Sequence, residues 1–378
     1  MWGDIAIAFV IAFITAFMTT PYTIKLARKL GAVDTPKDSR RINKVTMPRL
    51  GGLAIIAGFI VSVVYLILVM TLEKNTDLNL EEYKIKLIGF LVGSLVIGIV
   101  CFIDDVRGVP AWIKLIVQVL AAAIVVSSGV LIDSIKLPFF NVEADKVFSV
   151  LLTIGWIIGI TNALNLIDGL DGLASGISII SCLSLLMIFS LNGSPLIAII
   201  LITALGGALV GFLPFNFNPA RTFMGDTGSN FLGFCLSIIS ILGIAKTYTA
   251  IVIVAPLIVL ALPVFDTLFA IIRRIIKNKS LKAIMKPDAN HLHHKMLKKG
   301  FTQRQTVMIL YGISASLGMF AIVLLESGIW KALSFLLLVV GIIALGYKEF
   351  FRQKLISADE SDIIEYVDKN AKVRDSKK

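Results

Sequence analysis

The chain has 378 residues, of which 57% are hydrophobic and only 16% charged, and its mean hydropathy is +0.89. A soluble core cannot bury that much apolar surface, so the composition excludes a soluble globular protein and indicates a polytopic helical membrane protein. The net charge of +11 is explained by membrane topology and anionic lipid headgroups, so no nucleic-acid partner is expected.

Recurrent apolar blocks of about 17 to 22 residues, the length that a helix needs to cross a bilayer, run along the chain. The blocks are continuously apolar rather than alternating, which favours helices over a β-barrel. The predicted fold is therefore all-α, with an integral membrane domain over 1–347 and a charged cytoplasmic tail over 348–378. About eleven transmembrane helices are expected, near 4–24, 51–71, 86–103, 110–130, 147–164, 173–191, 195–213, 229–245, 249–272, 306–325 and 329–347.

The basic residues between the blocks predict the orientation. The first loop, 25–50, carries eight lysines and arginines, and the ninth, 273–305, carries ten. Because cytoplasmic loops hold the excess of these residues, odd-numbered loops are expected in the cytoplasm, with the N-terminus outside and the C-terminus inside. Every polar motif of the chain then faces the cytoplasm at the inner (plasma) membrane.

Acidic residues interrupt the apolar blocks at that face. Asp104 and Asp105 end the third span, Asp168 and Asp171 lie in "NALNLIDGLDGL" after the fifth, and Asp226 lies in "RTFMGDTGSN". One aspartate at the end of a span is as often a boundary marker as a functional group. Five of them on an otherwise basic surface indicate a divalent metal site for a phosphate substrate, with Mg²⁺ favoured over Zn²⁺ because oxygen ligands dominate.

The three histidines of the chain all lie in "HLHH", at His291, His293 and His294. Their clustering argues against a merely solvated loop. Two readings stay open: imidazoles that contact phosphate or sugar oxygens, and a zinc site that lacks a clear fourth ligand.

Taken in order, "MPRLGG", the aspartate pair, "NALNLIDGLDGL", "RTFMGDTGSN", "PVFDT" and "HLHH" resemble the polyprenyl-phosphate N-acetylhexosamine-1-phosphate transferases of the MraY superfamily. Within this superfamily, the motifs "RTFMGDTGSN" and "HLHH" are most similar to those of the WecA/TagO branch, which transfers GlcNAc-1-phosphate. The chain departs from the family at Asn43, where relatives have a histidine shortly before "PRLGG".

The resemblance implies a catalytic set. Asn165 and Asp226 match the family's Mg²⁺ ligands, with Mn²⁺ as an alternative ion. Asp104 and Asp105 match the pair on the lipid-phosphate side, and Lys114 matches the lysine near the transferred phosphate.

The resemblance also implies a nucleotide-sugar site. Asp171 matches a residue that hydrogen-bonds uracil, Phe223 one that stacks on it, and Asn216 lies where a nucleoside contact is expected. The remaining residues expected to line the cleft are Asp168, with a catalytic role, and His291, His293 and His294, which bind substrate.

The implied reaction is a single displacement in the membrane. Undecaprenyl phosphate attacks UDP-GlcNAc and gives undecaprenyl-diphospho-GlcNAc and UMP, which would initiate a surface glycan such as a teichoic acid linkage unit or a lipopolysaccharide O-antigen. One alternative keeps the reaction but takes a UDP-MurNAc-pentapeptide or another UDP-N-acetylhexosamine. A second alternative is a secondary transporter, whose charges should lie near the bilayer midplane.

Two points stay open in the sequence. A homodimer is one alternative for the assembly, because dimers occur among relatives. Asp266, about two turns before Arg273 and Arg274, is as well explained by pairing with them as by a catalytic role.

Overall fold

The computed structural model describes residues 2–35, 46–72, 80–132, 134–137, 140–143, 145–243, 250–278 and 291–342. The chain consists of two compact units, Met1–Leu325 and Glu326–Lys378. Within the second unit the described part is the apolar helix Ile329–Ile342. The expected cytoplasmic tail, 348–378, and Asn43 lie outside the described residues.

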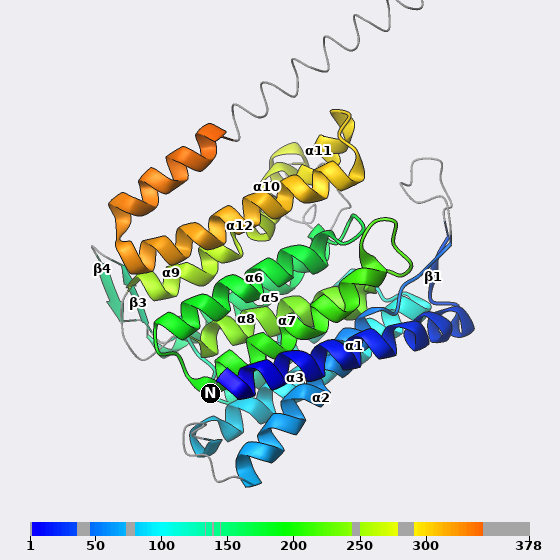
Figure 1. The fold of residues 1–378 in the computed structure, drawn as a ribbon, viewed down its shortest axis with the longest axis horizontal. Coiled ribbons are helices and arrows are strands. Elements are labelled where there is room, and N and C mark those ends of the chain that lie inside the picture. The colour runs from blue at the N-terminus through cyan, green and yellow to red at the C-terminus, as the bar shows by residue number, and fades with distance from the viewer. Residues whose placement is uncertain are drawn as a thin grey trace, which may run out of the picture. The chain divides into compact units, whose positions relative to one another are not determined.

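The first unit is built almost entirely of helices, as expected. Its helices are α1 (Trp2–Leu30), α2 (Gly52–Leu72), α3 (Leu80–Arg107), α4 (Ala111–Ser127), α5 (Lys146–Ile167), α6 (Leu173–Leu191), α7 (Leu196–Asn216), α8 (Gly225–Leu242), α9 (Ala250–Val259), α10 (Ala261–Asn278), α11 (Leu292–Lys298) and α12 (Gln303–Ser327) (Figure 1). Two antiparallel hairpins were not expected: β1 (Val33–Asp34) pairs with β2 (Met47–Pro48), and β3 (Ser134–Leu137) pairs with β4 (Phe140–Glu143).

Eight helices of the described part are long and apolar enough to cross a membrane. They are α1, α2, α3, α5, α6, α7, α8 and α12, and each coincides with one of the expected spans. Two further expected spans correspond to the shorter apolar helices Ala111–Ser127 and Ile329–Ile342. The number of eleven crossings and the orientation of the termini stay predictions.

The expected span at 249–272 is instead two helices, α9 and α10, separated at Leu260. Pro263, the third residue of α10, has no N–H to donate to the carbonyl of Val259, the last residue of α9, so the helical hydrogen bonding cannot run unbroken across Leu260. The apolar sequence hides this division because hydropathy alone does not distinguish one long helix from two short ones. After the division, α10 exposes Phe265 and Phe269 on its surface and ends in basic residues.

Helices α7 and α8 form the interior of the first unit, with 83% and 89% of their spans buried. Helix α8 packs against α2, α3, α5, α6 and α7. Its contact with α2 is backbone to backbone, because a Cβ placed on Gly52 would lie 2.2 Å from the amide nitrogen of Gly228. This close approach brings the first turn of α8 against the loop that precedes α2.

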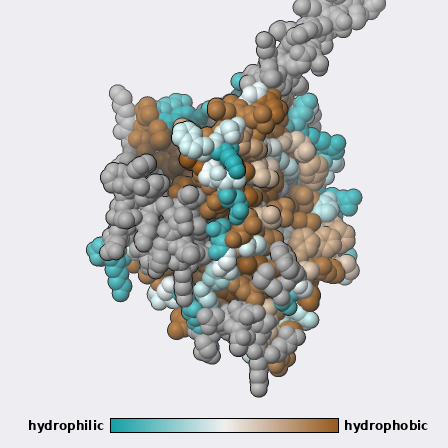
Figure 2. All heavy atoms as spheres, turned by 60° about the vertical axis from the view of Figure 1, so that its left-hand side comes forward, coloured by the Kyte–Doolittle hydropathy of each residue, from teal (hydrophilic) through white to brown (hydrophobic). Residues whose placement is uncertain are grey.

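Large apolar side chains remain exposed on several outer helices, among them Ile14 on α1, Leu68 on α2, Leu95 on α3 and Leu151 on α5. Figure 2 shows hydrophobic side chains over much of the visible face, with hydrophilic ones between them. A surface of this kind is stable in contact with lipid rather than water, which agrees with the composition.

Candidate active site

Four helix ends meet at one polar cluster. Asp104 and Asp105 lie in the last turn of α3, Lys114 in the first turn of α4, Asn165 in the last turn of α5 and Asp226 in the first turn of α8. Helix α3 ends just before Gly108, whose φ is +78°, and Pro110 precedes α4. These residues turn the chain sharply, so that the aspartate pair and the lysine come to the same place.

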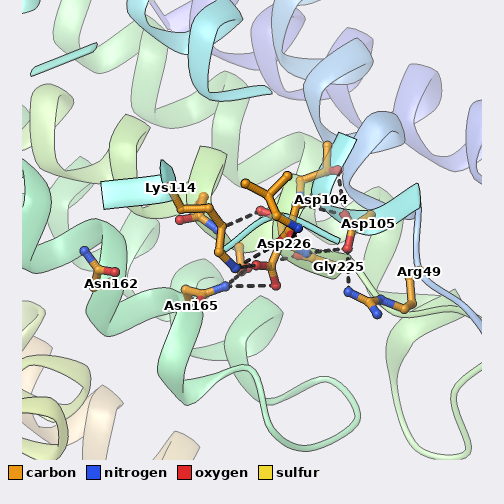
Figure 3. A network of polar contacts seen from close by, with 12 residues as sticks. Arg49, Asp104, Asp105, Lys114, Asn162, Asn165, Gly225 and Asp226 are labelled. Carbon is orange, nitrogen blue, oxygen red and sulfur yellow. Dashed lines mark hydrogen bonds and ion pairs between the residues drawn. The ribbon is translucent and has the colours of Figure 1, made fainter. Parts of the chain in front are cut away.

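The ammonium group of Lys114 lies between two carboxylates (Figure 3). Its Nζ is 2.8 Å from Oδ2 of Asp104 and 2.5 Å from Oδ2 of Asp226. Asn165 donates from Nδ2 to the other oxygen of Asp226 at 3.3 Å and to Ser229 Oγ at 2.8 Å. A cation is therefore stabilised between Asp104 and Asp226, and an amide stands beside it.

Asp105 holds the start of α8 in place. Its Oδ1 accepts from Arg49 NH2 and from the backbone N–H of Asp226, both at 3.0 Å, and its Oδ2 accepts from the backbone and hydroxyl of Thr227 at 2.8 and 2.6 Å. Both oxygens of the buried carboxylate are thus engaged, and its geometry is that of a positioning residue for Asp226. The sequence motif "MPRLGG" did not lead to a prediction for Arg49. Two adjacent carboxylates, Asp104 and Asp105, are each stabilised by a cation, so a partner for Asp105 in addition to Lys114 could have been expected.

Gly225, immediately before Asp226, makes this arrangement sterically possible. Its φ is +68°, and a Cβ there would lie 2.0 Å from the Arg49 carbonyl oxygen and 2.5 Å from Oδ2 of Asp105. An L side chain would meet both backbone strain and a clash. The glycine of "MGDTG" is therefore a requirement of the packing around Asp105.

One helical turn deeper, three amide side chains form a second polar layer that we call the amide layer: Gln118, Asn162 and Asn230. Asn162 donates to Gln118 Oε1 at 2.7 Å, and Gln118 donates to Asn230 Oδ1 at 2.9 Å. The three residues follow or precede Lys114, Asp226 and Asn165 by three or four positions on the same helices, so they lie on the same helix faces. That spacing is the signal by which the sequence could have revealed them.

Asp168 ends α5 as its C-terminal cap residue and is half-buried. It has no hydrogen-bond or ion-pair partner within the described part of the chain. Burial, together with the charges of Asp226, Asp105 and Asp171, raises the pKa of Asp168 to about 8. Burial beside other carboxylates disfavours the charged form of a carboxyl group, and a nearby cation favours it.

The predicted nucleoside residues gather around the loop between α7 and α8. Asp171 is buried, and its Oδ2 accepts from Asn218 Nδ2 at 2.9 Å and from the Ala220 backbone at 3.2 Å. Asn216 is buried with both ends of its amide engaged, by Ser175 and by the Thr222 carbonyl. Its geometry is thus that of a support for the loop.

Phe223 is half-buried in the same loop, and its backbone pairs with Pro48 and Gly51. The loop therefore ties together the start of α2, the start of α6 and the start of α8. Asp171 belongs to the turn between α5 and α6 and is tied by hydrogen bonds to Asn218 and Ala220 of the loop that carries Phe223.

The histidines pack against the turn after α5 and against α10. Nδ1 of His291 is 2.9 Å from Oδ2 of Asp266, whose other oxygen accepts from the Leu292 backbone at 2.9 Å. Asp266 thus binds the histidine segment. The ring of His293 is buried, and its Nε2 lies against Gly169, where a Cβ would be only 2.5 Å away.

His293 has no hydrogen-bond partner for either ring nitrogen among the described residues. Burial lowers its pKa to about 4, and the neighbouring charges of His294 and His291 act in the same direction. The rings of His293 and His294 lie 4.2 Å apart. His293 is therefore neutral near pH 7 and can accept one hydrogen bond and donate another.

The polar cluster offers few ligands of its own to a metal ion. In the residues that the structure describes, no group of three or more histidine, cysteine, aspartate or glutamate side chains is placed to hold a metal ion. Asp226 and Asn165 nevertheless offer a carboxylate and an amide, which are hard ligands, and the place beside them already holds the Lys114 ammonium. Mg²⁺ usually takes one or two protein ligands and completes its shell with phosphate and water. The residues fit that pattern.

Comparison with known proteins agrees with the geometry. Residues 87–244 match the sequence pattern of glycosyl transferase family 4. A Bacillus subtilis protein named as a probable undecaprenyl-phosphate N-acetylglucosaminyl 1-phosphate transferase is 38% identical over 337 residues, 89% of each chain. A Mycobacterium tuberculosis decaprenyl-phosphate N-acetylglucosaminephosphotransferase is 33% identical over 76% of this chain and 74% of its own length.

A more distant similarity reaches the branch considered as an alternative. A phospho-N-acetylmuramoyl-pentapeptide-transferase of Lactobacillus gasseri is 30% identical over 66% of this chain and 76% of its own length. The matches extend beyond the polar cluster to most of the membrane helices. The chain belongs to glycosyl transferase family 4.

Proposed function

We propose that this protein transfers GlcNAc-1-phosphate from UDP-GlcNAc to undecaprenyl phosphate. The observation that carries the proposal is the Lys114 ammonium held between Asp104 and Asp226 at the meeting point of four helices. A phosphoryl group in transfer needs positive charge at a fixed place. The Bacillus subtilis relative, similar over 89% of its length, is named for this reaction.

Asn165 and Asp226 would hold Mg²⁺, with Mn²⁺ as an alternative. When bound, the ion neutralises charge on the pyrophosphate of the donor. The ion would take the place that Lys114 occupies beside Asp226, and the lysine would then be free to contact the transferred phosphate. Asp105 and Arg49 keep Asp226 in position throughout.

Asp104 is proposed to face the acceptor phosphate. That phosphate is already largely ionised, so the reaction does not require Asp104 as an obligatory base. Asp168 is proposed to lie at the same cleft, where its charge would favour a bound cation. Catalysis then depends mainly on positioning and charge compensation.

An apolar groove supports a polyprenyl acceptor. It has a volume of about 410 Å³ and lies between α5 and the pair α9 and α10, lined by residues that include Trp156, Ile160, Ala163, Leu257 and Val264. Ala163 is two positions before Asn165, so the groove and the polar cluster lie on opposite faces of α5. An isoprenoid chain could remain in this apolar environment, and its phosphate would have to pass around the end of α5 to reach Asp104.

The orientation is part of the proposal. The excess of lysine and arginine in the first and ninth loops supports a polar cluster on the cytoplasmic side of the plasma membrane, where nucleotide sugars are available. The transporter alternative loses support because the charged residues lie at the ends of α3, α5 and α8 rather than in mid-span. The MurNAc-pentapeptide donor remains the second candidate, favoured by the Lactobacillus gasseri relative.

Release of UMP by the purified protein tests the proposal. Protein, undecaprenyl phosphate and Mg²⁺ are incubated separately with UDP-GlcNAc and with UDP-MurNAc-pentapeptide. We expect release with UDP-GlcNAc alone. Release only with the pentapeptide donor would assign the second candidate, and no release with either would contradict the transferase function.

A further inference from the structure

A chain of hydrogen bonds next to Asp171 runs through Arg304, Asn218 and Gln303 and fixes which atom of each amide donates and which accepts. Arg304, at the start of α12, donates from Nε to Asn218 Oδ1 at 3.2 Å and from NH2 to the Asn218 carbonyl oxygen at 3.0 Å. A guanidinium group can only donate. The Asn218 amide must therefore present its oxygen to Arg304 and its nitrogen to the other side.

That nitrogen has two acceptors. Asn218 Nδ2 donates to Asp171 Oδ2 at 2.9 Å and to Gln303 Oε1 at 3.0 Å. Because Gln303 has to accept here, its amide cannot be turned around without bringing two donors together. The orientation of Gln303 thus follows from that of Arg304.

Two buried atoms are left over. Asp171 Oδ1 and Gln303 Nε2 have no hydrogen-bond partner among the described residues, although both are shielded from solvent. One is an acceptor and the other a donor, and the opposite ends of the two side chains meet at the same Asn218 nitrogen. Buried polar atoms are normally paired, and an unpaired one costs about 1–3 kcal/mol. The two atoms are therefore available to a partner that presents a donor and an acceptor.

We infer that Gln303 is a nucleobase-specificity residue that donates to a carbonyl oxygen of uracil while Asp171 accepts from the neighbouring N3–H. The inference rests on the proposed function, whose donor carries uracil, and on the expectation from the family resemblance that Asp171 hydrogen-bonds this base. The imide edge of uracil presents an N–H flanked by carbonyl oxygens, which is the complement of the two unpaired atoms. Cytosine has no proton on N3, so in the same pose it would place an acceptor against Asp171 Oδ1, and its N4 amino group could donate to that oxygen only if the base shifted.

The loop that carries Asn218 also carries Phe223. A base that stacks on this ring and reaches Asp171 would contact residues that are linked to one another through Asn218. Arg304 contributes by fixing Asn218, so it is a positioning residue, and Gln303 alone makes the new contact. Specificity of this kind is large because a mismatched base leaves buried polar groups unpaired.

The test compares Gln303→Ala with Gln305→Ala in the full-length protein. Gln305 is a matched control because it lies in the same turn and its exposed side chain makes one hydrogen bond, accepted from the Thr302 backbone N–H, while its own backbone N–H donates to the Thr302 hydroxyl and is kept in the alanine variant. Loss of one neutral hydrogen bond predicts a KM for UDP-GlcNAc raised roughly 3- to 10-fold in Gln303→Ala. The KM for undecaprenyl phosphate and kcat should stay within twofold, and Gln305→Ala should resemble the wild type.

Donors with 2-thiouracil or 4-thiouracil identify the contact, because sulfur is a weaker acceptor than oxygen. One of the two should raise the KM of the wild type but leave that of Gln303→Ala unchanged. An equal effect of each thio donor on both proteins would contradict the inference, as would an unchanged KM of Gln303→Ala for UDP-GlcNAc.

Binding of UMP and CMP separates this inference from the transferase proposal. The wild type should bind UMP more tightly than CMP, and Gln303→Ala should lose that preference in part. Equal affinity of the wild type for the two nucleotides would overturn the inference. Selective UMP binding without any sugar-phosphate transfer would overturn the proposed function alone.

Discussion

The carboxylate of Asp266 on α10 accepts a hydrogen bond from His291 Nδ1 at 2.9 Å, and it does so across 25 positions of the chain. An ionised carboxylate can only accept, so the proton of His291 lies on Nδ1 when the ring is neutral. Nε2 is then left unprotonated and able to accept. One buried contact therefore fixes both the position and the tautomer of the histidine.

Asp266→Asn is expected to lower kcat/KM about 10- to 100-fold. The asparagine has one oxygen for two donors, His291 Nδ1 and the Leu292 N–H, so one of them loses its acceptor. A hydrogen bond to a charged group contributes about 1.5–3 kcal/mol, which corresponds to that range of rates. Steady-state rates should be measured beside thermal unfolding in the same detergent. Activity within twofold of the wild type would contradict the role of Asp266.

Asp226→Ala and Asn165→Ala are expected to abolish Mg²⁺-dependent turnover while the protein stays folded. Both remove an oxygen ligand from the proposed ion site. Mg²⁺ at about 100 times its dissociation constant should stabilise the wild type by about 2.7 kcal/mol, and neither variant should gain this. Thermal unfolding with Mg²⁺ and with EDTA checks the expectation. Normal turnover in both variants would remove the metal assignment.

Gly225→Ala is expected to destabilise the protein by about 1–3 kcal/mol and to reduce activity further. The alanine would combine a positive φ with contacts of 2.0 and 2.5 Å to Arg49 and Asp105, and strain at such positions costs about that much. Gly312→Ala is the control, because a Cβ on Gly312 meets nothing within 4 Å. It should be neutral or slightly stabilising. Equal unfolding temperatures for the two variants would contradict the expectation.

The sequence predicted the polar cluster better than the helices that carry it. Asp104, Asp105 and Asp226 are far apart in the chain, but each lies at a span end, so topology alone placed them on one face. The structure brings them together with Lys114. The division at Leu260 was missed because continuous hydropathy carries no information on where a helix bends.

Positioning residues were harder to predict than the charged ones. Arg49 lies in a quoted motif, and Gln118 lies four residues after Lys114, so charge balance and helical spacing could have revealed them. Gln303 has neither signal. Its significance depends on hydrogen-bond polarity transmitted from Arg304 through Asn218, which exists only in the folded chain.

The amide layer predicts non-additive stability. Gln118→Leu removes the hydrogen bonds of Gln118 with Asn162 and Asn230, each of which still donates to a backbone carbonyl, and should destabilise the protein by about 1–3 kcal/mol. Replacing all three amides with apolar residues removes the unpaired groups as well as the bonds, so it should cost less than the sum of the single changes. Thermal unfolding of the singles, doubles and triple gives the coupling. Strict additivity would show that the three side chains act independently.

The buried ring of His293 predicts a loss of stability in acid. Its pKa is about 4 in the folded protein, against about 6.5 in an unfolded chain. Between these values the unfolded state binds a proton that the folded state does not, so stability falls as the pH drops from about 6.5 towards 4. The largest contribution expected is on the order of 3 kcal/mol.

His293→Asn removes this titration and keeps a polar side chain of similar reach. Its unfolding temperature should therefore decline less than that of the wild type between pH 7 and pH 5. Asp168 also titrates: its raised pKa gives stability that is present at low pH and lost as the pH rises towards 8. Asp168 is present in both proteins, so its contribution cancels in the comparison. Parallel declines would show that His293 is protonated as readily in the folded protein as in the unfolded chain, and its ring would then have to exchange a proton with solvent despite its burial.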